Sequence, residues 1–416
     1  MEVKLNNIGT IPANGELGGI WIHPKNRGVA IKICDTDVNY MLINGKRGNS
    51  FDAVRDINFS HDGRSYAYVA TQGQMDVLIV DGEKIAEYEH IELKTLKWSD
   101  KGHLAYVYRQ DTEYFIVVNE QVSGPFNSIP GMNGFTSPIV FRPNSNDAAY
   151  RIRSDNGNSV LHINGAPVGE HTNIFPPVFC RDGSTYSFIA EDDDKKCVVW
   201  NDEKGEYYNN LGNLILSEDG TQFGYIAKLS FEEEHVVINN KKGQITQDIA
   251  DLVYLSGLNK FAYVASNGYD EDHETRFIVD GVHGPIYNDA ISNITVSPNG
   301  KHFGYIADHC EYQDDMPVKS KSLIILNHKL IGKHGNIVPT PNALAINNSG
   351  TKIAYLVYPE TNDHSATAVA INDEVGPWFD GTYGASTPGS FEFNGTDQIE
   401  YFAVRDEVIF LVKQAI

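Results

Sequence analysis

Carboxylates and histidines gather in four consecutive polar stretches of the chain, and each stretch joins two short apolar runs. The stretches read "AEDDDKK", "SFEEEH", "NGYDEDHE" and "ADHCEYQDD". Carboxylate oxygens bind calcium and attract basic partners. Carboxylates together with imidazole nitrogens can also bind zinc or another first-row metal. The stretches therefore suggest two kinds of chemistry, a metal site or a surface for a basic partner.

The metal hypothesis rests on histidines that stand beside carboxylates. No two of these histidines have the short HxxxH or HExxH spacing that places both on one metal ion, and neighbouring repeat units splay apart outward. We therefore predict no cofactor, and the alternative is calcium or zinc. The residues that would hold the metal are Asp272, His273, Asp308, His309 and Glu311.

The second hypothesis is a partner-binding rim formed by eleven other carboxylates of the four stretches. Such a field would attract a basic protein, whereas the ordinary interpretation of a charge run is a solvated edge that keeps the protein soluble. The rim residues are Glu191, Asp192, Asp193, Asp194, Glu232, Glu233, Glu234, Asp270, Glu271, Asp314 and Asp315.

Catalytic residues cannot be assigned from the sequence. The chain has no GxSxG nucleophile motif and no glycine-rich phosphate-binding loop after a strand. A carbohydrate-acting enzyme would need paired carboxylates, and Asp52, Asp248, Asp289 and Asp380 are available between repeat units. These four recur at equivalent places, so capping of the chain crossings is the simpler interpretation.

Composition narrows the range of partners. The chain has 416 residues, a formal net charge of −22 and a pI near 5.0. Nucleic acid and anionic membranes are bound through clustered Lys and Arg, so neither is expected as a partner. The first residues lack the basic and apolar regions of a secretory signal. Four cysteines without a CxxC pair indicate reduced thiols, and we expect a cytoplasmic protein.

The stretches are held by a repeat that runs through the whole chain. One unit reads "INFSHDGRSYAYVATQGQMDVLIVDGEK" from Ile57 to Lys84, with apolar alternation and an Asp-Gly turn, which are hairpin signals. An aromatic or aliphatic marker recurs at Ile31, Tyr68, Tyr106, Tyr150, Phe188, Tyr225, Tyr263, Tyr305, Tyr355 and Tyr401. A turn marker recurs with the same period at Asn44, Asp81, Asn119, Asn164, Asn201, Asn239, Asp280, Asn327 and Asn372.

A period of about 40 residues with four strands per unit is typical of β-propeller blades. The markers predict units that start near residues 17, 55, 93, 137, 176, 213, 251, 292, 343 and 388. The last unit has only three strands, and the N-terminal "EVKLNNIGTI" supplies the fourth. We predict an all-β fold, with residues 1–416 as a single propeller of about ten four-stranded blades, closed by pairing of the N-terminal strand with the last blade.

The units resemble the TolB-type, WD-like repeats of bacterial β-propellers, which couple "SPDG" to "AY" and then to "VDG". The matching residues include Ser297 to Gly300, Ala67-Tyr68 and Val80 to Gly82. The resemblance covers nearly the whole chain and implies architecture more than activity, because such propellers serve as interaction platforms, binding proteins or non-catalytic domains of peptidases.

The sequence therefore predicts a non-enzymatic binding or scaffold propeller that presents an acidic loop face to a protein partner of basic character. The alternatives are a hydrolase or lyase that acts on carbohydrate, or a cation-dependent binding module. The oligomeric state is left open.

Overall fold

The computed structural model describes residues 3–11, 15–22, 28–35, 38–130, 137–268, 272–313, 316–334, 337–338, 344–359, 366–382, 392–395 and 398–415. These residues form 43 β-strands, which make up ten antiparallel sheets. The described part of the chain has no helix that is long and apolar enough to cross a membrane.

Two compact units make up the chain. The first unit comprises Asn14–Ser230 and Val237–Lys242, and the second comprises Met1–Ala13, Phe231–Val236 and Gly243–Ile416. Strand β26 contributes residues to both units.

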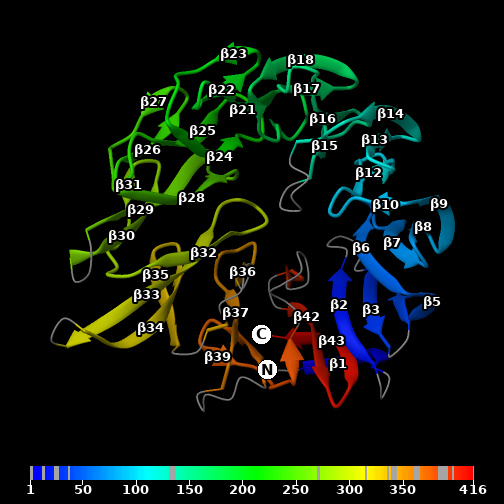
Figure 1. Cartoon of the computed structure of the whole chain (residues 1–416). Coiled ribbons are helices and arrows are strands. Elements are labelled where there is room, and N and C mark those ends of the chain that lie inside the picture. The colour runs from blue at the N-terminus through cyan, green and yellow to red at the C-terminus, as the bar shows by residue number, and fades with distance from the viewer. Residues whose placement is uncertain are drawn as a thin grey trace. The chain divides into compact units, whose positions relative to one another are not determined.

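The first unit contains five complete sheets, drawn in blue to green in Figure 1. Their strands are β2 (Glu16–Ile22), β3 (Val29–Cys34), β4 (Asn39–Ile43), β5 (Lys46–Phe51); β6 (Ala53–Phe59), β7 (Tyr66–Gln72), β8 (Met75–Val80), β9 (Glu83–Tyr88); β10 (His90–Ile91), β11 (Lys97–Trp98), β12 (Leu104–Gln110), β13 (Glu113–Val118), β14 (Gln121–Phe126); β15 (Ile139–Phe141), β16 (Ala148–Arg153), β17 (Ser159–Ile163), β18 (Ala166–His171); and β19 (Asn173–Ile174), β20 (Val178–Phe179), β21 (Tyr186–Asp192), β22 (Lys195–Trp200), β23 (Glu203–Lys204).

A sixth sheet consists of β24 (Asn210–Leu216), β25 (Phe223–Lys228), β26 (Glu234–Ile238) and β27 (Lys241–Lys242). The second unit holds the other four sheets. Their strands are β28 (Asp248–Leu255), β29 (Lys260–Asn267), β30 (Glu274–Val279), β31 (Val282–His283); β32 (Ile291–Val296), β33 (Phe303–Gln313), β34 (Met316–Leu326), β35 (Lys329–His334); β36 (Leu344–Ile346), β37 (Ile353–Val357), β38 (Ala368–Ile371), β39 (Glu374–Val375); and β40 (Gly381–Thr382), β41 (Glu392–Phe393), β42 (Gln398–Arg405), β43 (Val408–Ala415), β1 (Val3–Thr10).

Each sheet has the strand order of a propeller blade. Neighbours along the chain are neighbours in the sheet, and in three sheets the first strand is broken into two pieces that pair with the same second strand. We call the four successive strands A to D, so that β6, β7, β8 and β9 are A, B, C and D of one blade. The fold is thus a β-propeller of ten blades, which confirms the fold class and the blade count that the repeat predicted.

The turn marker of the sequence has a backbone cause. All nine marker residues have φ between 46° and 55°, a left-handed conformation that Asn and Asp tolerate better than other non-glycine residues. Several of their side chains also lock the turn to the start of strand B, whereas the Asn119 side-chain oxygen has no hydrogen-bond partner among the described residues. The Asn44 side-chain oxygen accepts a hydrogen bond from the Val29 amide at 2.8 Å. In the same way, Asp81 accepts a hydrogen bond from the Tyr66 amide and Asn239 accepts one from the Phe223 amide, both at 2.9 Å. The marker is therefore a requirement of the C–D turn.

The A–B turns also contain a repeated polar lock. Asp182 accepts hydrogen bonds from the Ser184 hydroxyl and amide, and these bonds, with one from Cys180, lower the pKa of Asp182 to about 2. Asp62 and Asp219 occupy the same position in their turns, and hydrogen bonds lower their pKa values in the same way. These three aspartates therefore have a structural role in their turns.

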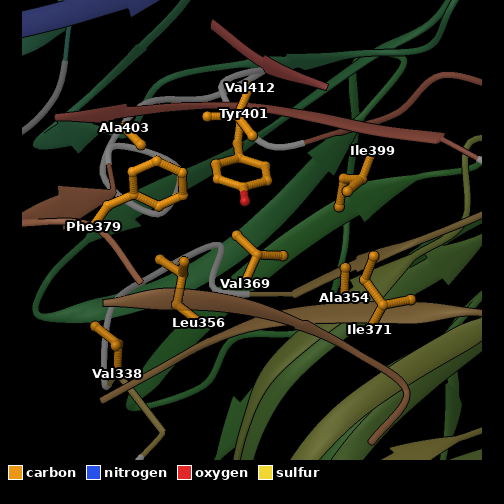
Figure 2. Close-up of a cluster of buried hydrophobic side chains, with 10 residues drawn as sticks. All are labelled: Val338, Ala354, Leu356, Val369, Ile371, Phe379, Ile399, Tyr401, Ala403 and Val412. Carbon is orange, nitrogen blue, oxygen red and sulfur yellow. The ribbon is translucent and has the colours of Figure 1, made fainter. Parts of the chain in front are cut away.

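The core lies between blades, because each sheet buries both faces against its neighbours. In the second unit, Ile399, Tyr401 and Ala403 of β42 point toward Leu356 of β37 and Val369 of β38, as Figure 2 shows. The aromatic marker belongs to this layer, since Tyr305, Tyr355 and Tyr401 are fully buried. Burial of one such side chain contributes about 2 kcal/mol, so the repeat of the marker reflects repeated packing.

The N-terminal strand completes the last blade. Strand β1 pairs antiparallel with β43, from Val3 opposite Gln414 to Thr10 opposite Val408, and the two chain ends lie in the same sheet (Figure 1). This pairing covers the hydrogen-bonding edge of β43 that would otherwise be exposed. The predicted exchange of strands between the two termini is confirmed.

Candidate functional site

The acidic stretches lie at the blade end where the B–C hairpins and the D–A crossings meet. Asp52, at a crossing, accepts a hydrogen bond from the Gly73 amide of a B–C turn at 2.7 Å. Asp380 likewise accepts a hydrogen bond from the Asp406 amide at 2.8 Å. These carboxylates hold the turn against the crossing, so capping is the role of Asp52 and Asp380. Asp289 accepts from the amide of Ala290, its neighbour in the chain, at 2.8 Å.

The first acidic stretch is a tight hairpin between β21 and β22. Glu191 stands opposite Lys196, and Asp192 stands opposite Lys195. Asp192 also contacts the His171 ring at 2.7 Å. Partial burial opposes ionisation, but the hydrogen bonds from His171 and from the Thr172 amide keep the pKa of Asp192 below its ordinary value. Lysines therefore offset part of the charge that the sequence assigned to the rim.

Exposed negative charge is concentrated at the tips of these hairpins. Asp193 and Asp194 form the β21–β22 turn with φ of 50° and 62°, and both are exposed. Glu232 and Glu233 are exposed in the segment between β25 and β26. Four of the predicted rim residues thus lie at the surface of hairpin tips.

Glu234 has a different position from its two neighbours in the chain. It is 1% exposed in β26, and its carboxylate accepts a hydrogen bond from the Ile249 amide at 3.0 Å. Asp76 does the same in another blade, where it is also buried and accepts from the Ile91 amide at 2.9 Å. The buried carboxylate fastens strand C to the following crossing, so Glu234 supports the blade from within.

An aromatic side chain accompanies the exposed glutamates. Phe231 is 95% exposed, directly before Glu232 and Glu233. Sequence reasoning treated "SFEEEH" only as an acidic stretch and missed the phenylalanine within it. The available signal was its position: the aromatic markers all lie in strand B, whereas Phe231 lies beyond the end of one.

The predicted metal ligands lie on two hairpins. Asp272 is exposed just before β30, and the His273 ring contacts the Thr275 hydroxyl at 3.3 Å. Asp308 accepts a hydrogen bond from the Ser322 hydroxyl at 2.6 Å. Burial raises the pKa of Asp308, and the nearby carboxylate of Asp289 raises it further. His309 stands opposite Lys321 in the β33–β34 ladder.

Strand β33 runs through residues that we expected in a loop, including Asp308, His309 and Glu311. Within the described residues, no three His, Cys, Asp or Glu side chains gather closely enough to hold a metal ion. The side chain of Glu311 and the predicted rim residues Asp270, Glu271, Asp314 and Asp315 lie outside the described part. The metal hypothesis stays a prediction.

A cavity of about 240 Å³ lies between two neighbouring blades of the first unit. Its walls come from β8 and β9 on one side and from the next blade on the other, and they are mainly apolar, with Trp98 and Tyr106 among them. The Trp98 ring nitrogen already donates to the Asn58 carbonyl at 3.2 Å, so its polar atom serves the fold. His103 and Glu120 also line the cavity.

Comparisons with known proteins show a shared fold. No protein-family model matches the sequence, and no curated protein matches it. The chain is similar to a solved structure described as the eukaryotic initiation factor, with 13% identity over 86% of this chain and 94% of that one and a TM-score of 0.50. It is also similar to the Dos1 propeller, with 12% identity, 72% and 92% coverage and a TM-score of 0.38.

A third similar structure is the propeller domain of the Trilobed protease from Pyrococcus furiosus. It is 12% identical, with 65% of this chain and 91% of that chain covered and a TM-score of 0.33. At such identities the comparisons show the propeller fold alone.

Proposed function

We propose that this protein is a non-enzymatic binding or scaffold propeller whose B–C hairpin tips engage a basic protein partner. The observation that carries the proposal is Phe231, an almost fully exposed aromatic side chain beside Glu232 and Glu233. Aromatic anchors surrounded by polar contacts supply most of the free energy in many protein interfaces. Such a side chain leaves water when it enters a pocket on a partner.

The surrounding charge favours a basic partner. Glu232 and Glu233 are exposed directly after Phe231, and the whole chain has a formal net charge of −22. Such a field accelerates encounter with a positively charged surface and disfavours acidic partners. The capping roles of Asp52 and Asp380 reduce the number of carboxylates available for carbohydrate chemistry, which weighs against the enzyme alternative.

We further propose that the chain belongs with the TolB-type, WD-like bacterial propellers and acts in the cytoplasm as one domain. The repeat motifs support the first proposal, and the cysteines support the second, because Cys180 and Cys197 are buried, unpaired thiols.

The proposal is tested by selecting ligands for the purified protein from a displayed random-peptide library. Selected peptides should be rich in Lys and Arg and carry an apolar residue, and their affinity should fall with added salt. Phe231→Ala should weaken binding roughly thirtyfold, because about 2 kcal/mol of apolar burial is lost. Ile85→Ala is the matched control, since Ile85 is also exposed but lies on β9, away from the acidic tips.

Enrichment of acidic or uncharged peptides would contradict the proposal. Binding that Phe231→Ala and a Glu232→Lys, Glu233→Lys double variant leave unchanged would also contradict it.

A further inference from the structure

Arg151 stands where other blades have an apolar residue. The position directly follows the aromatic marker in strand B, and eight of the nine other blades have Val, Ile, Leu or Phe there. Arg151 belongs to β16 and is 4% exposed, so its charge is buried in the layer that elsewhere packs blades together. The apolar residues at this position are Val69, Val107, Ile189, Ile226, Val264, Ile306, Leu356 and Phe402.

Most of the hydrogen-bonding capacity of this guanidinium is unused. Its Nη1 donates to the Ile174 carbonyl of the next blade at 2.6 Å. Its Nε and Nη2 are buried and have no hydrogen-bond partner within the described part of the chain. Among the described residues, no carboxylate forms an ion pair with Arg151, and the nearby charge is that of Arg153, which has the same sign.

Loss of the proton does not remove this charge. Burial, with a contribution from Arg153, lowers the pKa of Arg151 to about 10, so the side chain is still protonated at neutral pH. A buried charge without a counter-ion is strongly unfavourable. The arrangement therefore calls for a negative group that the described protein residues do not supply.

The unused nitrogens indicate the shape of that group. Nε and Nη2 form one edge of the planar guanidinium, with parallel N–H bonds that match the two oxygens of a carboxylate or phosphate. Two residues further along the strand, and on the same face as Arg151, one row across the sheet is formed by Arg153, Ser159 and His171, because Arg153 pairs with Ser159 and Ser159 with His171. The row faces the blade of β19–β23, since the His171 ring contacts Asp192 of β21.

The neighbouring polar groups are already engaged with the protein. Arg153 donates to the carbonyls of Gly157 and Thr172, both at 3.0 Å. Ser159 donates to the Asn173 side chain at 3.3 Å, and Asp192 is held by His171 and Lys204. Arg151, in contrast, has two buried nitrogens without a partner among the described residues, and these can donate to a ligand.

We propose that a small oxyanion, a carboxylate or a phosphate, binds between the blade of β15–β18 and the blade of β19–β23 (Figure 1), on the Nε–Nη2 edge of Arg151. The anion neutralises a charge that the blade otherwise buries at a cost. The site is independent of the hairpin tips around Phe231.

The test is a thermal melt of the full chain with sodium formate or sodium phosphate at constant ionic strength and pH. Either anion should raise the Tm in a saturable way, because a ligand that binds only the native state stabilises it by mass action. A response to formate alone identifies a carboxylate site, and a response to phosphate alone identifies a phosphate site.

Arg151→Leu should fold, because Leu356 occupies the same position in another blade, and it should melt above the wild type in the absence of either anion. It should no longer respond to the anions. Arg181→Leu is the matched control and should keep the response, since Arg181 is exposed and pairs with Glu218.

If Arg151→Leu does not fold, Arg151→Lys decides the question, because it keeps the charge and lacks the two-donor edge. A wild type that responds to neither anion, or a variant at position 151 that responds as the wild type does, overturns the proposal.

Discussion

Individual carboxylates near the hairpin tips have opposite roles although they are close in sequence. Glu233 is exposed, whereas Glu234 is buried and holds the Ile249 amide. The difference arises at a strand boundary, because Glu233 lies in the exposed segment before β26 and Glu234 is the first residue of this buried strand. A count of acidic residues in a stretch therefore overstates the charge that a partner would meet.

Asp308 gives a prediction about pH at the scale of one residue. Burial raises the pKa of Asp308, so in the folded state it holds its proton to higher pH than in the unfolded state. The free energy of unfolding therefore has its full value below 3.8, the ordinary pKa of Asp. It falls as the pH rises through the higher pKa that Asp308 has in the folded protein. Asp308→Asn keeps an acceptor for Ser322 and should be more stable than the wild type at pH 7, with no gain near pH 3.

Urea unfolding across this pH range measures the effect. Asp193→Asn, at the exposed β21–β22 turn, is the control and should show no such pH-dependent gain. A gain from Asp308→Asn that is equal at both ends of the range would contradict burial of the charge as its cause.

Turns are the elements that the sequence predicted best. Nine C–D turns have a left-handed Asn or Asp, and residues such as Asn239 also provide an acceptor for strand B. This turn chemistry recurs along the chain, so the register of the repeat could be predicted without a structure. Strand lengths could not, because the hairpin of β33 and β34 extends to 11 residues per strand through polar residues expected in a loop.

Asn239 provides a test of the turn at the scale of the element. Asn239→Ala loses the hydrogen bond to the Phe223 amide and places a Cβ in a strained backbone with φ of 48°. We expect a loss of about 2–3 kcal/mol in the free energy of unfolding. Asn239→Gly loses only the hydrogen bond and should cost about 1 kcal/mol.

Chemical denaturation of the two variants measures the difference. Equal losses would show that the left-handed backbone is not what selects Asn at this position.

The candidate site was harder to predict than its blades. The sequence indicated the acidic tips, because charge is visible in composition, but it did not separate Asp193 from Asp192, which contacts Lys204 and His171. Phe231 and Arg151 each break the repeat, and comparison of the units position by position reveals both. What the sequence lacks is burial, which makes one of them an exposed anchor and the other a buried charge.

At the scale of the whole molecule, we propose that residues 1–416 form one propeller domain. The two compact units share strand β26, with Glu234 to Val236 in one and Val237 to Ile238 in the other. Because a strand of this length cannot unfold by halves, we expect one cooperative transition in calorimetry, with equal calorimetric and van't Hoff enthalpies. Two resolved transitions would contradict the single domain.

The measurement that tests the proposed function most directly is photo-crosslinking in the living cells that make the protein, with a photoreactive phenylalanine analogue in place of Phe231. The account predicts a discrete adduct with a basic protein, which weakens when Glu232 and Glu233 are changed to Lys and is absent when the probe replaces exposed Ile85. The same adducts from both positions, no adduct from position 231, or an adduct with an acidic protein that survives the charge reversal would contradict it.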